Sequence, residues 1–273
     1  NIVGRSIKGS NLFYSKSDSS LTEQGVEVVS HPFSWNFWKT FGRDMYDGLF
    51  SALLASGYHS AETKRAGMHI HVSKASINKT QLHKLLWFIY ECPNLMNLIA
   101  QRTSDRWASL KWSSLLGNLD LSFKTKRKLV ARISNRKYSK YADRYTAVNL
   151  QPDNTIEFRM FNGTLNIMTL SKSIEFIHSL LNYCTNTSFK DIVNKYSESR
   201  RIIGYLDFLS QNQKRYPNLC VFLDRELNYL SDSKKNKFFG DAKRKVGRKL
   251  LLDGLSNTRT ASSFNLDKKG MIL

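Results

Sequence analysis

The sequence predicts a mixed α+β fold that ends in a helical part. Two segments, Gly67–Ser73 and Thr155–Phe161, alternate polar and apolar residues strictly, as a strand with one buried face does. Elsewhere apolar residues recur at helical spacing, and from Thr169 onward the strong patterns are helical. Length and composition agree with this class, because 273 residues with 41% hydrophobic content can bury a substantial core.

The N-terminal part is predicted to hold two strands and a helix. Short strands near Asn11–Ser17 and Gly25–Ser30 flank Ser17–Ser20, whose residue types favour turns. His31–Pro32 ends the second strand, because proline lacks the N–H that a strand ladder needs. Trp35–Ala55 follows as a helix, since its apolar residues recur every four positions.

Two further helices are expected on either side of a proline. Thr80 can cap a helix that runs to Glu91 and ends before Pro93, and Leu95–Ile99 forms the next one. The stretch that follows is polar and basic, and no regular element is predicted in it.

Strands and helices resume in the second half. Tyr145–Leu150 is predicted as a strand that a turn joins to the second motif strand. Helices are predicted at Leu170–Tyr183 and Tyr216–Leu230, and Ser188 forms a capping pair with Asp191 between them. Residues 1–233 are expected to form one domain, and residues 234–273, which are polar and basic, a mobile tail.

Hydropathy and cysteine usage indicate the kind of compartment in which the chain is expected to lie. No apolar run approaches the ~20 residues of a membrane helix, and the chain does not open with a signal-peptide pattern. The three cysteines, Cys92, Cys184 and Cys220, are far apart and odd in number. That argues against a disulfide framework and a zinc knuckle, and fits a reducing, cytoplasmic compartment without a membrane partner.

The net charge of +20 is concentrated in two runs. Lys124–Lys140 holds eight basic residues and no acid, and Lys234–Lys249 holds eight against Asp241 alone. Such runs attract polyanions, so both are candidate surfaces for non-specific nucleic-acid binding. A solvated basic face is the simpler alternative. No base-reading motif is present in the sequence.

The polar faces of the two motif strands carry the chemistry. The first presents His69, His71 and Ser73, and the second presents Glu157 and Arg159. Imidazoles beside a carboxylate and a guanidinium suit a site that binds a metal and a phosphate together. If the strands are neighbours, these side chains should lie within roughly 10 Å of one another.

Other charged residues extend this candidate site. Glu27, with Glu157, can supply the hard oxygen ligands that Mg²⁺ prefers. Arg159 can hold a phosphate through two hydrogen bonds. Arg102 and Arg144 are further candidates for a phosphate or a substrate carboxylate.

Structural alternatives exist for the same residues. A Glu157–Arg159 pair on one strand face is often a simple ion pair across a sheet. His69 and His71 can be surface imidazoles, or zinc ligands if a third histidine or cysteine ligand joins them. No cysteine lies near them in the sequence.

The motifs resemble a known group of ligases. Gly67–Ser73 resembles the Gly-Met-His-x-His-x-Ser strand of glutamine synthetases, and Ile156–Arg159 resembles their Ile-Glu-x-Arg strand. The longer segments Gly25–Pro32 and Arg144–Leu165 are similar to the putative amidoligase family, in the carboxylate–amine ligase branch of the glutamine synthetase superfamily. The resemblance covers roughly residues 10 to 185.

The resemblance implies a glutamine-synthetase-like antiparallel sheet with helices packed on one side and ATP and Mg²⁺ on its polar face. Such a ligase phosphorylates a carboxylate with ATP, and an amine then displaces the phosphate to form an amide. His69 matches a residue that touches metal and phosphates, and Glu157 and Glu27 match metal carboxylates. The predicted site comprises Arg159 and Arg144 for catalysis, His69, His71, Ser73, Arg102 and Arg159 for the nucleotide, and Glu27, His69 and Glu157 for the metal.

The chain departs from the family at its start. Relatives open with a Gly-x-Glu-x-Glu strand that supplies two metal carboxylates, and no such strand precedes Asn11. Either the sequence is a fragment or the metal site is depleted. Two alternatives to the ligase follow: a basic, nucleic-acid-associated or assembly protein on an inactive ligase-like fold, and an unrelated α+β metal-dependent hydrolase or nuclease using His69, His71 and Glu157.

Overall fold

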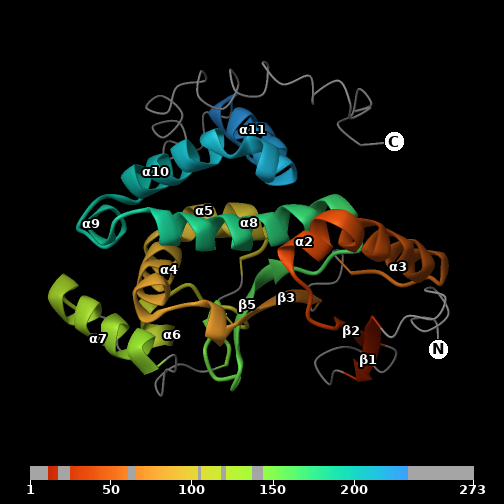
Figure 1. Ribbon diagram of the computed structural model, residues 1–273, viewed down its shortest axis with the longest axis horizontal. Helices are drawn as coiled ribbons and strands as arrows, with labels where there is room; N and C mark the ends of the chain where they lie inside the picture. The colour runs from red at the N-terminus through yellow and green to blue at the C-terminus, as the bar shows by residue number, and fades with distance from the viewer. Residues whose placement is uncertain are drawn as a thin grey trace. The chain divides into compact units, whose positions relative to one another are not determined.

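The structure is a computed structural model that describes residues 12–17, 25–60, 66–103, 106–117, 121–136 and 144–232 (Figure 1). It confirms a mixed α+β architecture, mostly helical with small antiparallel sheets. Three predictions fall outside the described residues: the turn at residues 18–20, the end of the Lys124–Lys140 run, and the basic tail at residues 234–273 with Lys234–Lys249.

The chain divides into two compact units. The first takes its residues from 1–76, 99–119 and 138–174, and the second from 77–98, 120–137 and 175–273. The division falls within two helices, α5 (Pro93–Ala100) and α8 (Ile167–Asn186). Both motif strands belong to the first unit, whereas the described part of the second unit contains helices and loops only.

The first unit holds two small sheets where a single sheet was expected. In one, β1 (Phe13–Ser17) pairs with β2 (Val26–Ser30). The other has three strands in the order β3, β5, β4, namely β3 (Gly67–Ser73), β5 (Thr155–Asn162) and β4 (Val148–Asn149). All these pairings are antiparallel, as expected.

β4 is much shorter than the predicted strand Tyr145–Leu150. The start of that segment makes its hydrogen bonds with Ser109: Ser109 N–H donates to Tyr145 O, and Ala147 N–H donates to Ser109 O, both at 2.9 Å. Ser109 and Thr146 thereby form a parallel bridge. Backbone groups that bond to Ser109 are taken out of the ladder with β5, which explains the shorter strand.

The predicted helix at Trp35–Ala55 is confirmed, in three pieces. α2 (Trp35–Phe37) continues through a π-helical turn, η1 (Trp38–Gly42), into α3 (Arg43–Ala55). Ser34 caps its start, because Ser34 Oγ accepts a hydrogen bond from Phe37 N–H at 3.1 Å. Its buried residues Trp38, Leu49, Phe50 and Leu53 form a core cluster with Phe13 of β1 and Leu170 of α8. Two short helices complete the first unit, η2 (Lys74–Ser76) and α6 (Trp112–Leu116).

The second unit is built around α4 (Lys79–Glu91). Its cap differs from the prediction: Asn78, not Thr80, forms a capping box with Gln81, since each side chain bonds to the other residue's backbone N–H at 2.9 Å. α7 (Phe123–Arg136) packs against α4 through Phe123, whose ring meets the Trp87 ring edge to face with 5.2 Å between centroids.

α7 lies in the stretch where no regular element was predicted. Its apolar positions, such as Val130 and Ile133, are buried, but they are few among many basic residues. The helical period is therefore weak in the sequence. Packing against α4 stabilises a helix that the apolar pattern alone does not predict.

The helical C-terminal part is confirmed. α8 is followed by α9 (Phe189–Ile192), α10 (Glu198–Gln211), the short η3 (Gln213–Arg215) and α11 (Pro217–Asp232). The Ser188–Asp191 capping pair is present, since Ser188 Oγ accepts from Asp191 N–H at 3.2 Å. Cys92, Cys184 and Cys220 are buried and free, as expected for a chain without a disulfide framework. Among the described helices, none is long and apolar enough to cross a membrane.

Gly42→Ala should destabilise the first unit. A Cβ at position 42 would lie 2.6 Å from Cε3 of the buried Trp38 ring, so the ring or the helix must shift. We expect urea denaturation to show a loss of about 1–3 kcal/mol of unfolding free energy. Gly48→Ala is the control, because a Cβ there has no neighbour within 4 Å and alanine favours a helix by up to about 1 kcal/mol. Equal stabilities of the two variants would contradict this packing.

Candidate functional site

The two motif strands are direct neighbours. β3 and β5 pair antiparallel, with His71 opposite Glu157 and Ser73 opposite Thr155. The exposed residues of β3 alternate with half-buried ones as predicted, and His69 and His71 are on the exposed face. The register shifts between Met68 and Ile70, which indicates a β-bulge at His69. Bulges re-aim side chains, and here His69 points to the Glu157 carboxylate.

The Glu157 carboxylate is the centre of the cluster. Its Oε1 accepts a hydrogen bond from Arg159 Nη1 at 2.6 Å and lies 3.1 Å from His69 Nδ1 and 3.9 Å from His71 Nε2. Its Oε2 accepts from Asn149 Nδ2 at 2.7 Å. Glu157 is only 6% exposed, so these partners replace most of the water that an exposed carboxylate would have.

Asn149 is a site residue that the sequence reasoning missed. It lies on β4, directly opposite Glu157 in the sheet. Its Oδ1 accepts from Gln151 N–H at 2.9 Å, which turns its NH₂ group towards Glu157. The signal available was its place in the segment that resembles the amidoligase family, beside the strand that carries Glu157.

These contacts fix the charge state of Glu157. Burial by itself would raise its pKa, but the hydrogen bond from His69, the charge of Arg159 and the hydrogen bond from Asn149 lower the pKa to about 2. Glu157 is therefore an anion at every pH at which the protein is expected to work.

Burial favours the neutral form of His71. Its Nδ1 lies 2.9 Å from Thr155 Oγ1. Burial lowers its pKa below the ordinary 6.5, and this outweighs the raising effect of the Glu157 and Glu27 charges. The influence of Glu27 indicates that β2 brings this carboxylate near the cluster. Val28, its neighbour on β2, packs on the core cluster of the first unit, so alternation turns Glu27 away from that core.

A second guanidinium lies beside the first. Arg102 Nη1 is 3.4 Å from Phe161 O, and a Cβ at position 67 would lie only 2.7 Å from that nitrogen, so Gly67 makes room for it. Burial lowers the pKa of Arg102, and the Arg159 charge lowers it further, which shows that the two cations are close. Arg159 Nε is buried and has no hydrogen-bond partner among the residues that the structure describes.

The backbone before Arg102 is held by a buried lysine. Gln101 has φ of +52°, which non-glycine residues rarely adopt. Lys172, 2% exposed, donates from Nζ to Ile99 O and, at 3.2 Å, to Gln101 Oε1. Ile99 is in the last turn of α5, where carbonyl groups lack helical partners and attract a cation. Lys172 therefore helps to fix the conformation from which Arg102 reaches Gly67.

Two predicted site residues have other contacts. Ser73 Oγ accepts from Ala75 N–H at 3.2 Å, and Ser73 O accepts from Ser76 Oγ, so Ser73 stabilises the turn after β3. Arg144 is exposed and lies on Tyr145, to whose Oη it donates at 2.6 Å. These contacts do not join either residue to Glu157.

The donor set for a metal is small. Across the described ranges, no three histidine, cysteine, aspartate or glutamate side chains are arranged to hold a metal ion. The closest pair is His69 with Glu157, and the Glu157–Arg159 contact is also the ion pair of the simpler structural alternative. That alternative does not explain why the buried Nε of Arg159 has no hydrogen-bond partner within the described ranges.

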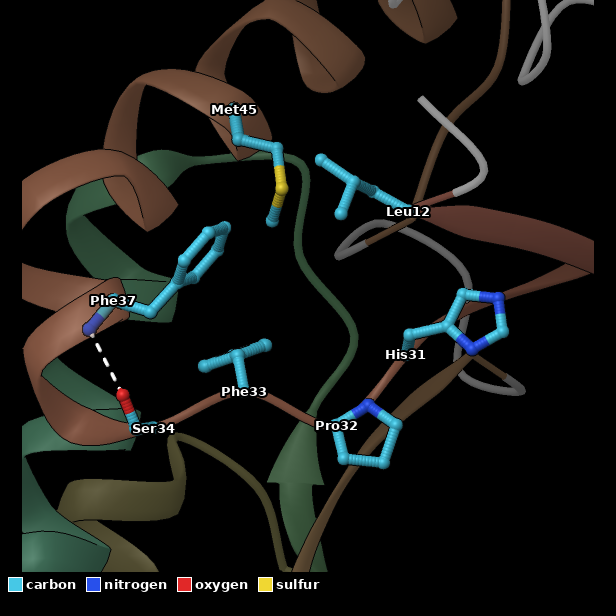
Figure 2. A pocket seen from close by; sticks show the side chains of 7 residues that line it. All are labelled: Leu12, His31, Pro32, Phe33, Ser34, Phe37 and Met45. Atoms are coloured by element: carbon cyan, nitrogen blue, oxygen red, sulfur yellow. Dashed lines mark hydrogen bonds between the residues drawn. The ribbon is translucent and has the colours of Figure 1, made fainter. Parts of the chain in front are cut away.

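The first unit also contains an apolar pocket, which Figure 2 shows from close by. It has a volume of about 260 Å³ and lies where β2 leads into α2. Phe37 and Met45 face its interior, and His31 and Pro32 lie at the strand end (Figure 2). None of the predicted catalytic residues lines it; its lining comprises Leu12, His31, Pro32, Phe33, Ser34, Phe37 and Met45.

The cluster thus brings together one buried carboxylate, two imidazoles and two guanidiniums on one sheet and its flank. Residues 8–181 match the model of the family described as "Putative amidoligase enzyme", and this is well over half of the chain. The chain therefore belongs to that family, as the resemblance predicted. Searches of curated proteins and of solved structures gave no significant match.

Glu157→Gln should alter the pH dependence of stability. The folded pKa of about 2 lies below the ordinary 4.5, so ionised Glu157 stabilises the fold above pH 4.5, and this contribution is lost as the pH falls towards 2. Its size is about 3 kcal/mol, at about 1.4 kcal/mol per pKa unit. Urea denaturation should show a wild-type advantage that is largest near pH 7 and shrinks in acid. An advantage independent of pH would show that the charge of Glu157 is not what the cluster stabilises.

Proposed function

We propose that the chain is an ATP- and Mg²⁺-dependent carboxylate–amine ligase that forms an amide through an acyl-phosphate intermediate. Membership of the amidoligase family supports the class of reaction. The observation that carries the proposal is the buried Nε of Arg159, which has no hydrogen-bond partner among the described residues. Arg159 lies close to Arg102 and contacts Glu157, which pairs with His69. Catalysis is assigned to the residues of the first unit, within a proposed ligase-like domain of residues 1–233.

The cations fit a phosphate. Arg159 Nη1 donates to Glu157, whereas its Nε has no acceptor among the described residues. The charge of Arg159 lowers the pKa of Arg102, so the two guanidiniums are close. Buried N–H groups without partners are costly, so an anion that accepts from Nε would relieve that cost. Arg159 and Arg102 lie close to each other, and two guanidiniums together can hold the oxygens of one phosphate.

The donor set also fits a divalent cation in part. Octahedral ligands at about 2.1 Å from Mg²⁺ lie ~3 Å from each other, and His69 Nδ1 is 3.1 Å from Glu157 Oε1. Glu27 is the further oxygen donor whose charge reaches this region. A bound Mg²⁺ would supply positive charge to the phosphoryl oxygens. With so few protein ligands, water and phosphate would provide the remaining positions.

The reaction that these residues would serve has two steps. A carboxylate oxygen of the substrate attacks the γ-phosphorus of ATP, the bond to the bridging oxygen breaks, and ADP leaves. The amine nitrogen then attacks the acyl carbon, the bond from that carbon to the phosphate oxygen breaks, and inorganic phosphate and a proton leave. Negative charge on the phosphoryl oxygens must be balanced in both steps.

Each residue of the cluster has a role in that balance. Arg159 and Arg102 bring fixed positive charge to the phosphoryl oxygens, since guanidinium groups stay protonated. Glu157, ionised because of its low pKa, orients His69 and Arg159. Asn149 holds the second oxygen of Glu157 and so fixes the plane of the carboxylate. His71 and Ser73 extend the same face towards the nucleotide in this proposal.

The sheet arrangement of glutamine synthetases is part of the proposal. It is supported by the antiparallel pairing of the two motif strands and by the family match. The substrates are a carboxylate and an amine, as the family name implies, and the apolar pocket in Figure 2 is large enough for a side chain of one of them.

Arg159→Ala should remove ATP-dependent amide formation by the full-length protein. We expect a loss of about 10²–10³-fold in turnover, the cost of removing one group that stabilises transition-state charge. The measurement is release of ADP and phosphate with Mg²⁺, over a panel of amino acids and peptides, with mass spectrometry of the amide. Stability should change little, because Glu157 keeps His69 and Asn149.

Two other arginine variants make this test specific. Arg225→Ala is the matched control, since Arg225 is exposed on α11 and pairs with Glu226; it should retain wild-type turnover. Arg144→Ala tests whether that exposed guanidinium takes part in catalysis, as the sequence predicted. Full turnover by Arg159→Ala, or no ATP consumption by the wild type with any pair of substrates, would overturn the proposed function.

A further inference from the structure

Helix α7 in the second unit has two unlike sides. Phe123, Val130 and Ile133 pack inward, with Val130 and Ile133 buried and the Phe123 ring against Trp87. Lys126 also lies on this side, where its Nζ is 3.7 Å from Glu91 of α4. The inward side therefore holds the helix on the unit and leaves the other side to solvent.

The outward side of α7 is basic throughout. Its exposed cations are Lys124, Arg127, Lys128 and Arg132, and no acid occurs anywhere in Phe123–Arg136. We call these four residues the α7 basic face. Lys124, Lys128 and Arg132 follow one another at four-residue steps, about 6 Å apart along the helix axis. The face is thus a straight row of charge about 12 Å long, with Arg127 at its side.

Among the described residues, the carboxylate that pairs with α7 does so through Lys126, on the inward side. The carboxylate of Glu91 is engaged by Lys126 and, at 3.6 Å, by Arg201. Lys195 adds an exposed cation next to the start of α7, with its Nζ 5.7 Å from the Phe123 ring. Arg127 stacks on Phe189 at 5.3 Å, which fixes its guanidinium without cancelling its charge.

We propose that the α7 basic face binds the phosphate backbone of a nucleic-acid duplex without reading the base sequence. A duplex carries one charge per ~1.7 Å of its axis, so a row of cations releases many condensed counterions on contact. The face is composed of lysine and arginine with Thr125, Ala131 and Asn135 between them.

The same composition disfavours other polyanions. Single-stranded nucleic acid is bound largely by stacking on aromatic side chains, and the exposed positions of α7 carry none. A helix that lies on a membrane needs large apolar residues to insert beside its lysines, and this side of α7 has none either. A duplex needs neither, because its backbone is a dense and regular array of phosphates. This inference is independent of the proposed ligase activity.

The test compares two variants of equal net charge in the full-length protein. The first replaces the face by glutamine, as K124Q, R127Q, K128Q and R132Q. The control replaces four other exposed lysines, as K39Q, K79Q, K190Q and K214Q. Fluorescence anisotropy with a labelled 30-base-pair duplex, in DNA and RNA versions of several sequences, gives affinity as a function of salt concentration. Thermal melting checks that both variants are folded.

The expected result is a change in the salt dependence. Each phosphate contact contributes about 0.9 to the slope of log affinity against log salt, so the face variant should have a slope shallower than wild type by about 3 to 4. The contribution of the face should amount to about a hundredfold in affinity between 50 and 200 mM salt. The control should keep a slope near that of the wild type, and affinity should vary little among sequences.

Other outcomes overturn the proposal. Equal slopes for wild type and face variant, or no duplex binding by the wild type, would show that α7 does not contact a duplex. Equal losses in both variants would assign binding to net charge and not to this face. Tighter binding of labelled oligothymidylate than of the duplex would assign a single-stranded partner. If the face variant lost only its binding to phosphatidylserine vesicles, the surface would serve a membrane.

Discussion

The pairing of β3 with β5 is the contact on which the candidate site depends. It places the histidine strand beside the Glu157–Arg159 strand, with His71 opposite Glu157. The register is fixed from the other side of the sheet, where Ile156, Phe158 and Met160 of β5 are buried. A slip by one residue would exchange the two faces and bury the charged side chains in the apolar layer. Hydrophobic packing thus sets the position of a polar site in which it takes no direct part.

The charges within that site explain how a buried carboxylate is stabilised. A buried carboxylate is costly unless its oxygens are satisfied, and Glu157 has Arg159 and His69 on one oxygen and Asn149 on the other. The same contacts would serve a structural ion pair. The difference lies in Arg102, a second guanidinium close to Arg159, and in Arg159 Nε, which has no hydrogen-bond partner in the described part of the chain. The proposed ligase uses these two guanidiniums for phosphoryl oxygens.

The two units carry two unlike kinds of positive charge. In the first unit, the guanidiniums are partly buried and held by backbone contacts, such as Arg102 with Phe161 O, which suits a small and specific anion. In the second unit, the α7 basic face is exposed and its residues have few fixed partners, which suits a long polyanion held by counterion release. The family match ends at residue 181, within α8, so α9, α10 and α11 lie beyond the matched residues.

Sequence periodicity was sufficient for the elements whose own pattern is strong. Strict alternation defined β3 and β5, and four-residue spacing defined the helix from Trp35 to Ala55. Periodicity was insufficient for elements whose formation depends on packing against other parts of the chain. α7 has few apolar residues and is stabilised by α4, and β4 is cut short because Ser109 takes the hydrogen bonds of the preceding residues. The formation of α7 and the length of β4 both depend on contacts between residues far apart in the chain, which local sequence patterns do not reveal.

The candidate site likewise contains residues that the sequence identified and residues that only the structure identified. The sequence by itself determined that His69, His71, Glu157 and Arg159 share a chemistry, because their residue types and alternation identify polar strand faces. Only the tertiary structure decided that Asn149 completes the Glu157 carboxylate and that Lys172 fixes the turn before Arg102. An amide and a lysine are ordinary residues until the fold brings a carboxylate or a carbonyl within about 3 Å, where hydrogen bonds form. Residue type gives the capacity for a contact, and the three-dimensional register decides whether it is made.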